Sequence, residues 1–317
     1  METGIVFGPV PSRRLGRSLG INNIPPKTCT YSCVYCQLGK TTNMTMERRS
    51  FYEPEVIFQN VKEKLGELAL RNEKADYLTF VPDGEPTLDI NLGRTISLLK
   101  QTGIPVAVLT NASLIWRGDV KEDLLQADLV SLKIDALSEK LWRKIDRPHK
   151  DLKLGPILEG IKEFARGFQG KIITETMLVD NISYGDEFPK IADFLKGRKT
   201  LDKAYIAIPT RPPAEKWVRP AEERTINHAF QVFSEVLGVE KVEYLIGYEG
   251  NAFSVFGKIE KDLLSIMSVH PMRQEAVIEL LRKANADWHL IEGLLEENKI
   301  VELEYQGNKY YMRRLIK

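Results

Sequence analysis

Six short runs of apolar and β-branched residues recur along the first two thirds of the chain, and segments with apolar residues at helical spacing separate them. The runs cover residues 18–24, 77–81, 106–109, 129–134, 172–179 and 204–208. Between the first two runs, Ile57, Val61 and Leu65 lie four residues apart after Pro54, which is typical of one face of a helix. Strands that alternate with helices in this way predict an α/β fold with a parallel sheet.

Toward the C-terminus the pattern changes. A helix from about Ile259 precedes two short segments with apolar residues at helical spacing, and two alternating segments follow them. The alternating segments, residues 300–305 and 309–315, are expected to pair as a β-hairpin around a polar turn. The order of helix, helix and hairpin predicts a small winged-helix-like domain over residues 259–317, after a first domain over residues 1–258.

The composition indicates a globular chain without a dominant charge. Hydrophobic residues make up 43% of the 317 residues, and 45 Lys and Arg face 44 Asp and Glu. This balance excludes a strongly basic nucleic-acid coat protein, so a charged partner needs a local patch. The longest apolar stretches, such as residues 104–109, are shorter than the ~18 residues of a membrane span. We therefore expect a cytoplasmic protein without a membrane partner.

Charge also bears on the partner of the C-terminal segment. Residues 259–317 contain nine Lys or Arg against ten Asp or Glu. The second expected helix carries Asp287, Glu292 and Glu296, which would repel the phosphates beside a DNA groove. DNA is therefore not expected as a partner. We expect instead a contact with a protein or peptide, or a lid that keeps water out of an active site.

The three cysteines of the chain, Cys29, Cys33 and Cys36, lie within eight residues. A disulfide framework does not fit so few and so closely spaced residues. A closed zinc site needs four ligands, and the nearest histidine, His149, lies more than a hundred residues beyond Cys36. Three thiolates that leave one position open favour an iron–sulfur cluster. Three ordinary small residues in a loop are the alternative.

The segment from Cys29 to Cys36 reads CTYSCVYC and resembles the CxxxCxxC signature of the radical S-adenosylmethionine (radical SAM) superfamily, in which the residue before the last cysteine is usually aromatic, as Tyr35 is. The resemblance implies a partial (β/α)6 TIM-like barrel with a 4Fe–4S cluster on the three cysteines. It implies that S-adenosylmethionine binds the fourth iron and is cleaved by one electron to a 5′-deoxyadenosyl radical, which takes hydrogen from a substrate. A reductant such as a flavodoxin or ferredoxin is the implied partner.

A second motif follows the second strand. Residues 80–88 read FVPDGEPTL and resemble the family's glycine-rich motif, whose backbone meets the methionine amino group. The resemblance implies that Gly84, Glu85 and Pro86 bind the cofactor. Residues 8–29 are similar to a subgroup related to the tRNA wyosine-base synthases, which hold a second cluster on additional cysteines that this chain lacks. We therefore expect a peptide, a protein or a small metabolite as the substrate, with a tRNA base as the alternative.

The remaining cofactor candidates lie on the expected strands or directly after them, at the carboxyl ends where barrel active sites are found. With Tyr35, they are Thr110, Asn111, Ser131, Lys133, Asp135 and Ile208. Thr110 and Asn111 have an alternative role in a turn, because both side chains bond to nearby backbone. Lys133 interrupts a buried apolar run and needs a partner, for which the methionine carboxylate, Asp135 and Glu175 are the candidates.

Four further residues are candidates for contacting the substrate. They are Arg13, Arg14, His149 and Arg211. Arginines bind phosphate and carboxylate groups well, but solvation at the surface is the alternative for each of them, and a histidine in a loop is more often solvated than catalytic. For the whole chain, the alternative of another class is a protein that binds or senses through an iron–sulfur cluster without radical turnover.

Overall fold

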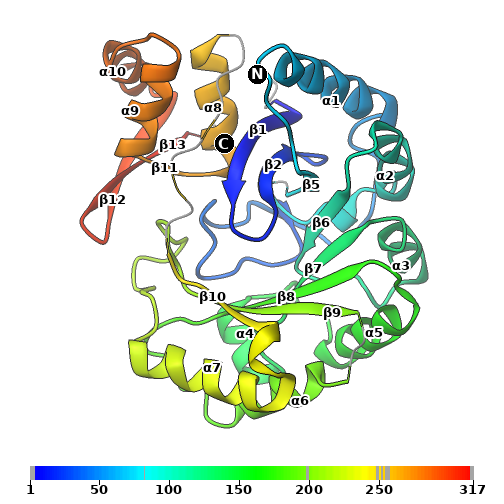
Figure 1. Ribbon diagram of the computed structural model, residues 1–317. Coiled ribbons are helices and arrows are strands. Elements are labelled where there is room, and N and C mark those ends of the chain that lie inside the picture. Colours follow the sequence, from blue (N-terminus) through cyan, green and yellow to red (C-terminus); the bar gives the residue numbers. More distant parts are fainter. Residues whose placement is uncertain are drawn as a thin grey trace.

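The computed structural model describes residues 4–81, 83–197, 200–247, 250, 253 and 258–314. The described residues form an eight-stranded sheet that curls into an open half-barrel (Figure 1). Its strands are β1 (Val6–Ser12), β2 (Gly16–Ile21), β5 (Tyr77–Phe80), β6 (Val106–Thr110), β7 (Leu129–Lys133), β8 (Lys171–Met177), β9 (Leu201–Ala207) and β10 (Val242–Leu245). They are adjacent in this order, with β1 antiparallel to β2 and all later neighbours parallel.

The six runs predicted as strands all lie in this sheet, which confirms the partial barrel. Sequence analysis does not predict β1 and β10, which form the two edges of the sheet. β1 contains Pro9 and Pro11, and proline is tolerated mainly in edge strands because it cannot donate to a neighbour. β10 is only four residues long, which is too short for its alternation to stand out.

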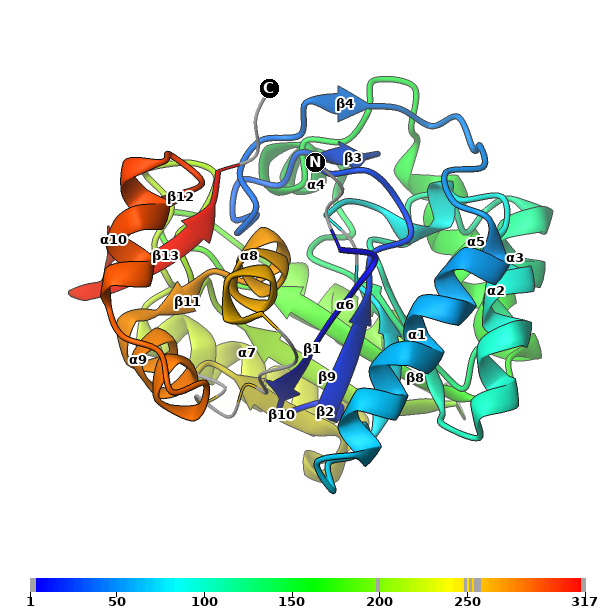
Figure 2. The ribbon, with the colours of Figure 1, turned by 90° about the horizontal axis from the view of Figure 1, so that it is seen from above.

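Helices cover the outer face of the sheet (Figures 1 and 2). They are α1 (Pro54–Ala69), α2 (Leu92–Leu99), α3 (Gly118–Leu124), α4 (Glu139–Ile145), α5 (Leu154–Gly167), α6 (Glu187–Leu195) and α7 (Glu223–Leu237), with short 3-10 helices η1 (Pro86–Leu88), η2 (Lys100–Thr102) and η3 (Val239–Lys241). Pro54 opens α1, and Ile57, Val61 and Leu68 are buried on its inner face. Among the described residues, every helix falls short of the length and apolarity that a bilayer crossing requires.

Apolar side chains close the amino-terminal end of the barrel interior. Leu15, in the turn between β1 and β2, is buried together with Ala107, Leu129, Ile173 and Tyr205 from four successive parallel strands. The layer lies near the starts of β6, β7 and β8, and it includes Tyr205 farther along β9. It therefore forms a floor below their carboxyl ends, where the interior of such a barrel receives its ligands.

The C-terminal segment contains α8 (Ile259–Val269), α9 (Gln274–Lys283) and α10 (His289–Glu296), and a sheet in the order β11 (Met272–Arg273), β13 (Asn308–Arg313), β12 (Ile300–Tyr305). The predicted order of helix, helix and hairpin is confirmed, and Leu315, at the predicted end of the hairpin, lies outside the described residues. The winged-helix interpretation and the domain boundary after residue 258 stay predictions.

The C-terminal segment shares its core with an edge of the barrel. Phe7 and Val10 of β1 are buried in the same apolar cluster as Leu263 and Met267 of α8. Figure 2 shows α8 beside β1, and the two elements are in contact. The segment is therefore positioned by apolar packing against the first strand of the half-barrel.

Candidate active site

The three cysteines lie in a loop after β2, the cysteine loop (residues 27–45), which carries the short parallel strands β3 (Thr28–Cys29) and β4 (Asn43–Met44). The Cys36 N–H donates to the Cys33 carbonyl at 3.1 Å, and the Val34 N–H donates to the Ile145 carbonyl, at the end of α4, at 2.9 Å. Local turns and an anchor to a helix thus hold the loop so that all three thiols line one cavity.

The second motif packs directly against the cysteine loop. The Glu85 N–H donates to the Thr28 carbonyl at 3.1 Å, and the Lys27 N–H donates to the Asp83 carbonyl at 2.8 Å. A Cβ atom on Gly84 would lie only 1.8 Å from the Thr28 carbonyl oxygen, so this approach requires glycine. The backbone at Gly84 therefore forms a wall of the same cavity. Pro82 of this motif lies outside the described residues.

The carboxylate of Glu85 is buried and surrounded by donors from two segments. Its Oε1 accepts hydrogen bonds from the hydroxyls of Thr87 (2.6 Å) and Thr110 (2.5 Å), and its Oε2 accepts one from the Asn111 N–H (2.8 Å). Burial raises the pKa of Glu85, and these hydrogen bonds oppose the rise. Glu85 thereby ties the second motif to the end of β6. Pro86 opens η1 behind it and is not part of the cavity lining.

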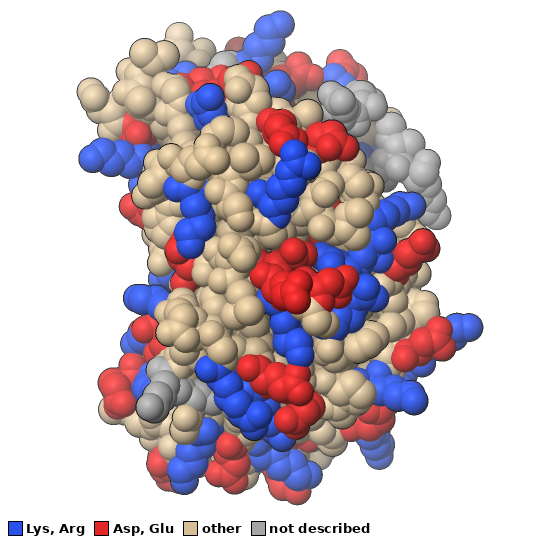
Figure 3. All heavy atoms as spheres, turned by 90° about the vertical axis from the view of Figure 1, so that its right-hand side faces the viewer, with Lys and Arg blue, Asp and Glu red and all other residues tan. Residues whose placement is uncertain are grey.

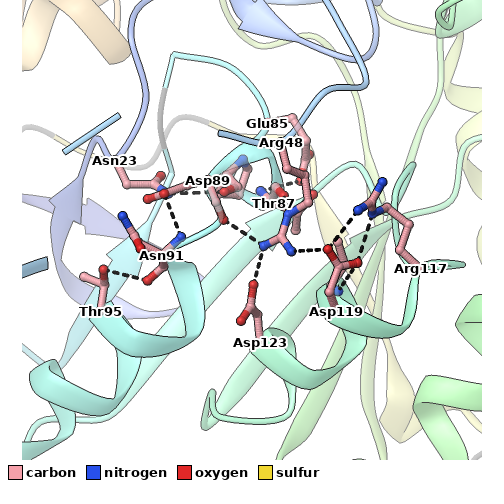
Figure 4. Close-up of polar contacts among 12 residues, drawn as sticks. Asn23, Arg48, Glu85, Thr87, Asp89, Asn91, Thr95, Arg117, Asp119 and Asp123 are labelled. Carbon is pink, nitrogen blue, oxygen red and sulfur yellow. Dashed lines mark hydrogen bonds and ion pairs between the residues drawn. The ribbon is translucent and has the colours of Figure 1, made fainter. Parts of the chain in front are cut away.

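Arg48 holds the second motif from its other side, a role that sequence analysis does not predict. Its guanidinium donates to the carbonyls of Thr87 and Asp89, both at 2.8 Å, and forms ion pairs with Asp119 and Asp123 (Figure 4). Only 5% of the Arg48 side chain is exposed. A buried arginine with this many partners fixes the loop between Glu85 and α2.

Tyr35 joins two carboxylates beside the cysteine loop. Its hydroxyl donates to Asp135 and lies 3.2 Å from Asp146 Oδ1, which also accepts the thiol of Cys33 at 3.5 Å. Burial and the neighbouring Asp135 carboxylate raise the pKa of Asp146 well above its usual range. Asp135 is not part of the cavity lining. It acts on the site through the Tyr35 hydroxyl.

Lys133 has Glu175 as its partner, one of the three candidates that sequence analysis leaves open. The Lys133 Nζ lies 3.3 Å from Glu175 Oε2 and 5.0 Å from the centre of the Tyr35 ring, where the ring face attracts a cation. Glu175 also pairs with Arg14 and accepts the Ser131 hydroxyl at 3.4 Å. Two cations thus meet one carboxylate inside the barrel.

A single cavity of about 320 Å³ collects these groups. The predicted site residues that line it are Arg13, Arg14, Cys29, Cys33, Tyr35, Cys36, Gly84, Glu85, Thr110, Asn111, Ser131, Lys133, Ile208 and Arg211. Pro86, Asp135 and His149 are absent from this lining. The His149 N–H instead donates to the Thr30 carbonyl at 2.8 Å, so this residue supports the cysteine loop through its backbone. Gln37 and Glu175 also line the cavity, although neither is predicted as a site residue.

The C-terminal segment holds a further part of the cavity wall, residues 208–211. The hydroxyls of Tyr305 and Tyr310 donate to the carbonyls of Pro209 (3.0 Å) and Thr210 (2.8 Å). These carbonyls directly follow β9 and lie in the cavity lining. The C-terminal hairpin therefore determines the course of the chain at the carboxyl end of β9.

Arg211 and Gln37 link this wall to the cysteine loop. Arg211 donates to Gln37 Oε1 at 3.0 Å and lies 3.0 Å from His270 Nε2, and Gln37 donates to the Val269 carbonyl at 2.9 Å. Burial, together with the Arg211 charge, lowers the pKa of His270 well below its usual value, so its neutral ring accepts the bond from Arg211. The residue after Cys36 is thus connected to the end of α8.

Burial raises the pKa of Cys29 to about 12 and, together with the Asp146 carboxylate, raises that of Cys33 well above its usual value. A metal binds the thiolate, so metal binding at these residues is coupled to loss of the thiol protons. Without a positively charged group beside them, burial therefore favours the protonated thiol at these two residues.

Comparison with known proteins agrees with this geometry. Residues 23–195 match the family model of the Radical SAM superfamily. A UPF0026 protein of Methanocaldococcus jannaschii is 51% identical over 312 residues, which cover 98% of this chain and 96% of that protein. The similarity extends over both the half-barrel and the C-terminal segment.

Two solved structures share the fold at low sequence identity. SuiB of Streptococcus suis, bound to its precursor peptide SuiA, has a TM-score of 0.54 and 15% identity, over 72% of this chain and 49% of SuiB. TYW1 with a lysine–pyruvate adduct has a TM-score of 0.51 and 16% identity, over 70% of this chain and 74% of TYW1. Identities this low show a common fold and nothing about a common substrate.

Proposed function

This chain belongs to the radical SAM superfamily, and on that premise we propose that Cys29, Cys33 and Cys36 hold a 4Fe–4S cluster beside a site for S-adenosylmethionine. Together the two groups supply, when bound, a 5′-deoxyadenosyl radical that takes a hydrogen atom from a substrate. The observation that carries the proposal is that all three thiols and the Gly84 backbone line one cavity at the carboxyl end of the barrel.

The donor set fits such a cluster. Among the described residues, no three His, Cys, Asp or Glu side chains converge in the way that a single metal ion requires. A cluster does not need this convergence, because each cysteine binds a different iron atom. Asn111 stabilises the first ligand, since its amide donates to Thr30 Oγ1 at 2.8 Å and lies 3.6 Å from Cys29 Sγ.

The chain's own residues have three tasks in this proposal. The backbone at Gly84, held in place by Glu85, receives the amino group of the cofactor. Ser131 and Lys133 offer polar groups to its carboxylate and ribose, and Ile208 offers an apolar surface to adenine. Each of these side chains is on a strand or directly after one, so the sheet fixes its position.

Exclusion of water is the remaining task, because a carbon radical must not meet water or oxygen. The bonds from Tyr305 and Tyr310 to Pro209 and Thr210 hold the C-terminal segment over one side of the cavity. We assign to this segment the role of a fixed cover. A low-potential reductant such as a flavodoxin or ferredoxin then delivers the electron from outside.

We place the substrate among peptides, proteins and small metabolites rather than tRNA bases. Lysine and arginine side chains are interspersed with aspartate and glutamate over the face that carries α1, α2 and α3 (Figure 3). A tRNA-binding protein is expected to gather cations into a continuous surface. The balance of 45 Lys and Arg against 44 Asp and Glu over the whole chain supports the same choice.

The test is anaerobic reconstitution with iron and sulfide, followed by S-adenosylmethionine and a strong reductant. We expect the absorption and paramagnetic resonance of a 4Fe–4S cluster, and release of 5′-deoxyadenosine. Cys33→Ala should abolish both, whereas Thr42→Ala, an exposed position in the same loop, should preserve both. A stable cluster with no 5′-deoxyadenosine above the cluster-free control would show instead a binding or sensing protein. Zinc, or no metal, on the wild-type chain would overturn the proposal entirely.

A further inference from the structure

The side chains that face the interior of the barrel change from apolar to polar or charged over two residues along some of its strands. Ala107, Leu129 and Ile173 belong to the buried floor. Two residues farther along the same strands, Leu109, Ser131 and Glu175 line the cavity. Side chains two residues apart on a strand lie on the same face, so Ser131 and Glu175 stand directly above the floor.

Arg14 reaches this level from the turn that also supplies the floor residue Leu15. It pairs with Glu175, which Lys133 approaches from the next strand at 3.3 Å. The exposed fractions of the three side chains are 15% for Arg14, 11% for Glu175 and 18% for Lys133. Arg13 lies beside them and donates to the Gly247 carbonyl at 3.4 Å. Arg14, Glu175 and Lys133 are thus largely withdrawn from solvent but open to the cavity, whereas Arg13 is exposed.

The cavity has an excess of positive charge. Among the described residues that line it, four are cations (Arg13, Arg14, Lys133, Arg211) and two are carboxylates (Glu85, Glu175). Glu85 already accepts bonds from Thr87, Thr110 and Asn111. Cations in a cavity of low polarity attract an anion more strongly than the same cations at a surface, because water screens them less. Arginine in addition matches the geometry of phosphate and carboxylate oxygens.

Arg14 enters the charged level from the amino-terminal end of the barrel, opposite the segments that carry the cysteines and the second motif. Cys29, Gly84 and Asn111 lie in segments that follow the carboxyl ends of β2, β5 and β6. Glu175 is two residues before the end of β8, and Arg14 precedes the start of β2. A group bound at Arg14 therefore lies toward the floor of the cavity, whereas Lys133, which ends β7 level with Glu175, is shared between this group and the proposed cofactor.

We propose that the substrate of this enzyme is a small molecule with an oxyanion group, a phosphate or a carboxylate, and that this group binds at Arg14 beside Glu175 on the floor of the cavity. The proposal rests on the proposed function, since it names the substrate class of the same site. The enclosed position of Arg14 favours a small molecule over a polymer. Anchoring of the anion on the floor directs the rest of the substrate toward the rim, where hydrogen abstraction would take place.

The experiment measures binding and involves no turnover. Cluster-loaded protein, saturated with S-adenosylmethionine under anaerobic conditions, is titrated calorimetrically with pyrophosphate and, separately, with malonate. The two probes distinguish a phosphate from a carboxylate as the preferred anion. Three variants are compared, Arg14→Gln, Glu175→Gln and, as a control, Arg94→Gln, whose exposed side chain on α2 pairs with Glu55 far from the cavity.

The two cavity variants have opposite expected effects. Arg14→Gln should lower the binding affinity for the preferred probe by about tenfold or more, because a charge-assisted contact is lost. Glu175→Gln should raise the binding affinity for this probe by roughly threefold to tenfold, because a neutral amide replaces the carboxylate that competes for Arg14 and Lys133. Arg94→Gln should leave the affinity unchanged. Arg14→Lys, which keeps the charge, should retain most of the binding if Arg14→Gln proves unstable.

Three results would overturn the inference. The wild type could bind neither probe. Glu175→Gln could weaken binding as much as Arg14→Gln, which would make the ion pair purely structural. The probe could displace S-adenosylmethionine, which would assign Arg14 to the cofactor carboxylate. Formation of 5′-deoxyadenosine is measured separately, so its absence alongside the expected titrations would reject the radical reaction and leave the anion site standing.

Discussion

Two walls of the same cavity are built in different ways. The motif wall, residues 83–89, is held by the barrel itself, through the Thr28 carbonyl, the buried Glu85 network and Arg48. The C-terminal wall, residues 208–211, is held from outside the barrel, by side chains of the C-terminal segment. The first wall depends on close backbone packing, and the second depends on a few side-chain hydrogen bonds to carbonyl groups.

This difference predicts which of the two walls tolerates amino-acid substitutions. Close backbone packing leaves no room for an extra atom, so a small substitution there has a large effect. A single hydrogen bond to a carbonyl contributes about 1 kcal/mol net, so its loss is felt locally. We therefore expect substitutions in the motif wall to abolish cofactor binding, and substitutions that release the C-terminal wall to loosen the cavity while the cluster and cofactor remain bound.

Gly84→Ala should have the largest effect on cofactor binding. The new Cβ would meet the Thr28 carbonyl oxygen, so the motif must move away from the cysteine loop, with a loss of stability of about 3 kcal/mol. We expect S-adenosylmethionine binding, measured by equilibrium dialysis of the cluster-loaded protein, to be lost. Gly66→Ala in α1 is the matched control, because nothing lies within 4 Å of its added Cβ, and alanine there should stabilise by about 1 kcal/mol. Unchanged cofactor affinity in Gly84→Ala would refute the close packing.

Arg48→Gln should have the next largest effect. It removes the bonds to the carbonyls of Thr87 and Asp89 and leaves Asp119 and Asp123 without their shared cation. The free energy of unfolding, measured by denaturant titration, should fall by about 3–5 kcal/mol, and cofactor affinity should fall with it. Arg94→Gln, which breaks the exposed pair with Glu55, should change stability by less than about 1 kcal/mol. Equal effects of the two variants would contradict the role of Arg48.

Asp83→Asn tests the point at which the motif wall approaches the C-terminal segment. Burial raises the pKa of Asp83 to about 7, against the opposing charges of Lys27 and of Arg313 on β13. A carboxyl group with a raised pKa stabilises the fold at low pH, and this contribution is lost as pH rises through about 7. Between pH 5 and pH 8, the free energy of unfolding of the wild type should therefore fall by about 2 kcal/mol relative to that of Asp83→Asn.

The measurement for Asp83 is thermal unfolding of both proteins, free of cluster, across this range of pH. Asp193→Asn, at an exposed position on α6, should show no such dependence relative to the wild type. A wild type that gains stability over Asp83→Asn as the pH rises would mean that Lys27 and Arg313 outweigh burial. The motif wall would then depend on the C-terminal segment through Arg313, and the contrast between the walls would weaken.

Sequence patterns predict the motif wall far better than the C-terminal wall. The cysteine spacing and the glycine of the second motif are local signals, and both correspond to residues whose backbones touch. The role of Arg48 cannot be read in this way, because its partners lie 39 to 75 positions farther along the chain. The bond from Tyr310 to Thr210 spans 100 positions. Such contacts depend on how the strands and helices are arranged in space. The alternation and spacing of residues in the sequence predict this arrangement only coarsely.

The same reasoning explains the mixed result for single candidates. Lys133 is recognisable because a cation in an apolar strand requires a partner, but the choice of Glu175 depends on the register of β7 and β8, which places the two residues side by side. His149 is a candidate for contacting the substrate in the sequence, yet it is absent from the cavity lining and its backbone N–H bonds to the Thr30 carbonyl. Residue type thus predicts that a contact exists, and strand register decides which one.

Tyr310→Phe should have the smallest effect on stability and on cofactor binding. It is also the most direct test of the difference between the two walls. The variant loses the bond to the Thr210 carbonyl and the one accepted from Arg273, and stability should fall by about 1–2 kcal/mol. Tyr311→Phe is the matched control, because its hydroxyl bonds to Glu302 within the same hairpin and leaves the barrel untouched. Amide hydrogen exchange in residues 207–211 should become faster in Tyr310→Phe alone, with iron content and cofactor affinity unchanged in both variants. Loss of cofactor binding in Tyr310→Phe would mean that the two walls form one cooperative unit, because release of one would then have disordered the other.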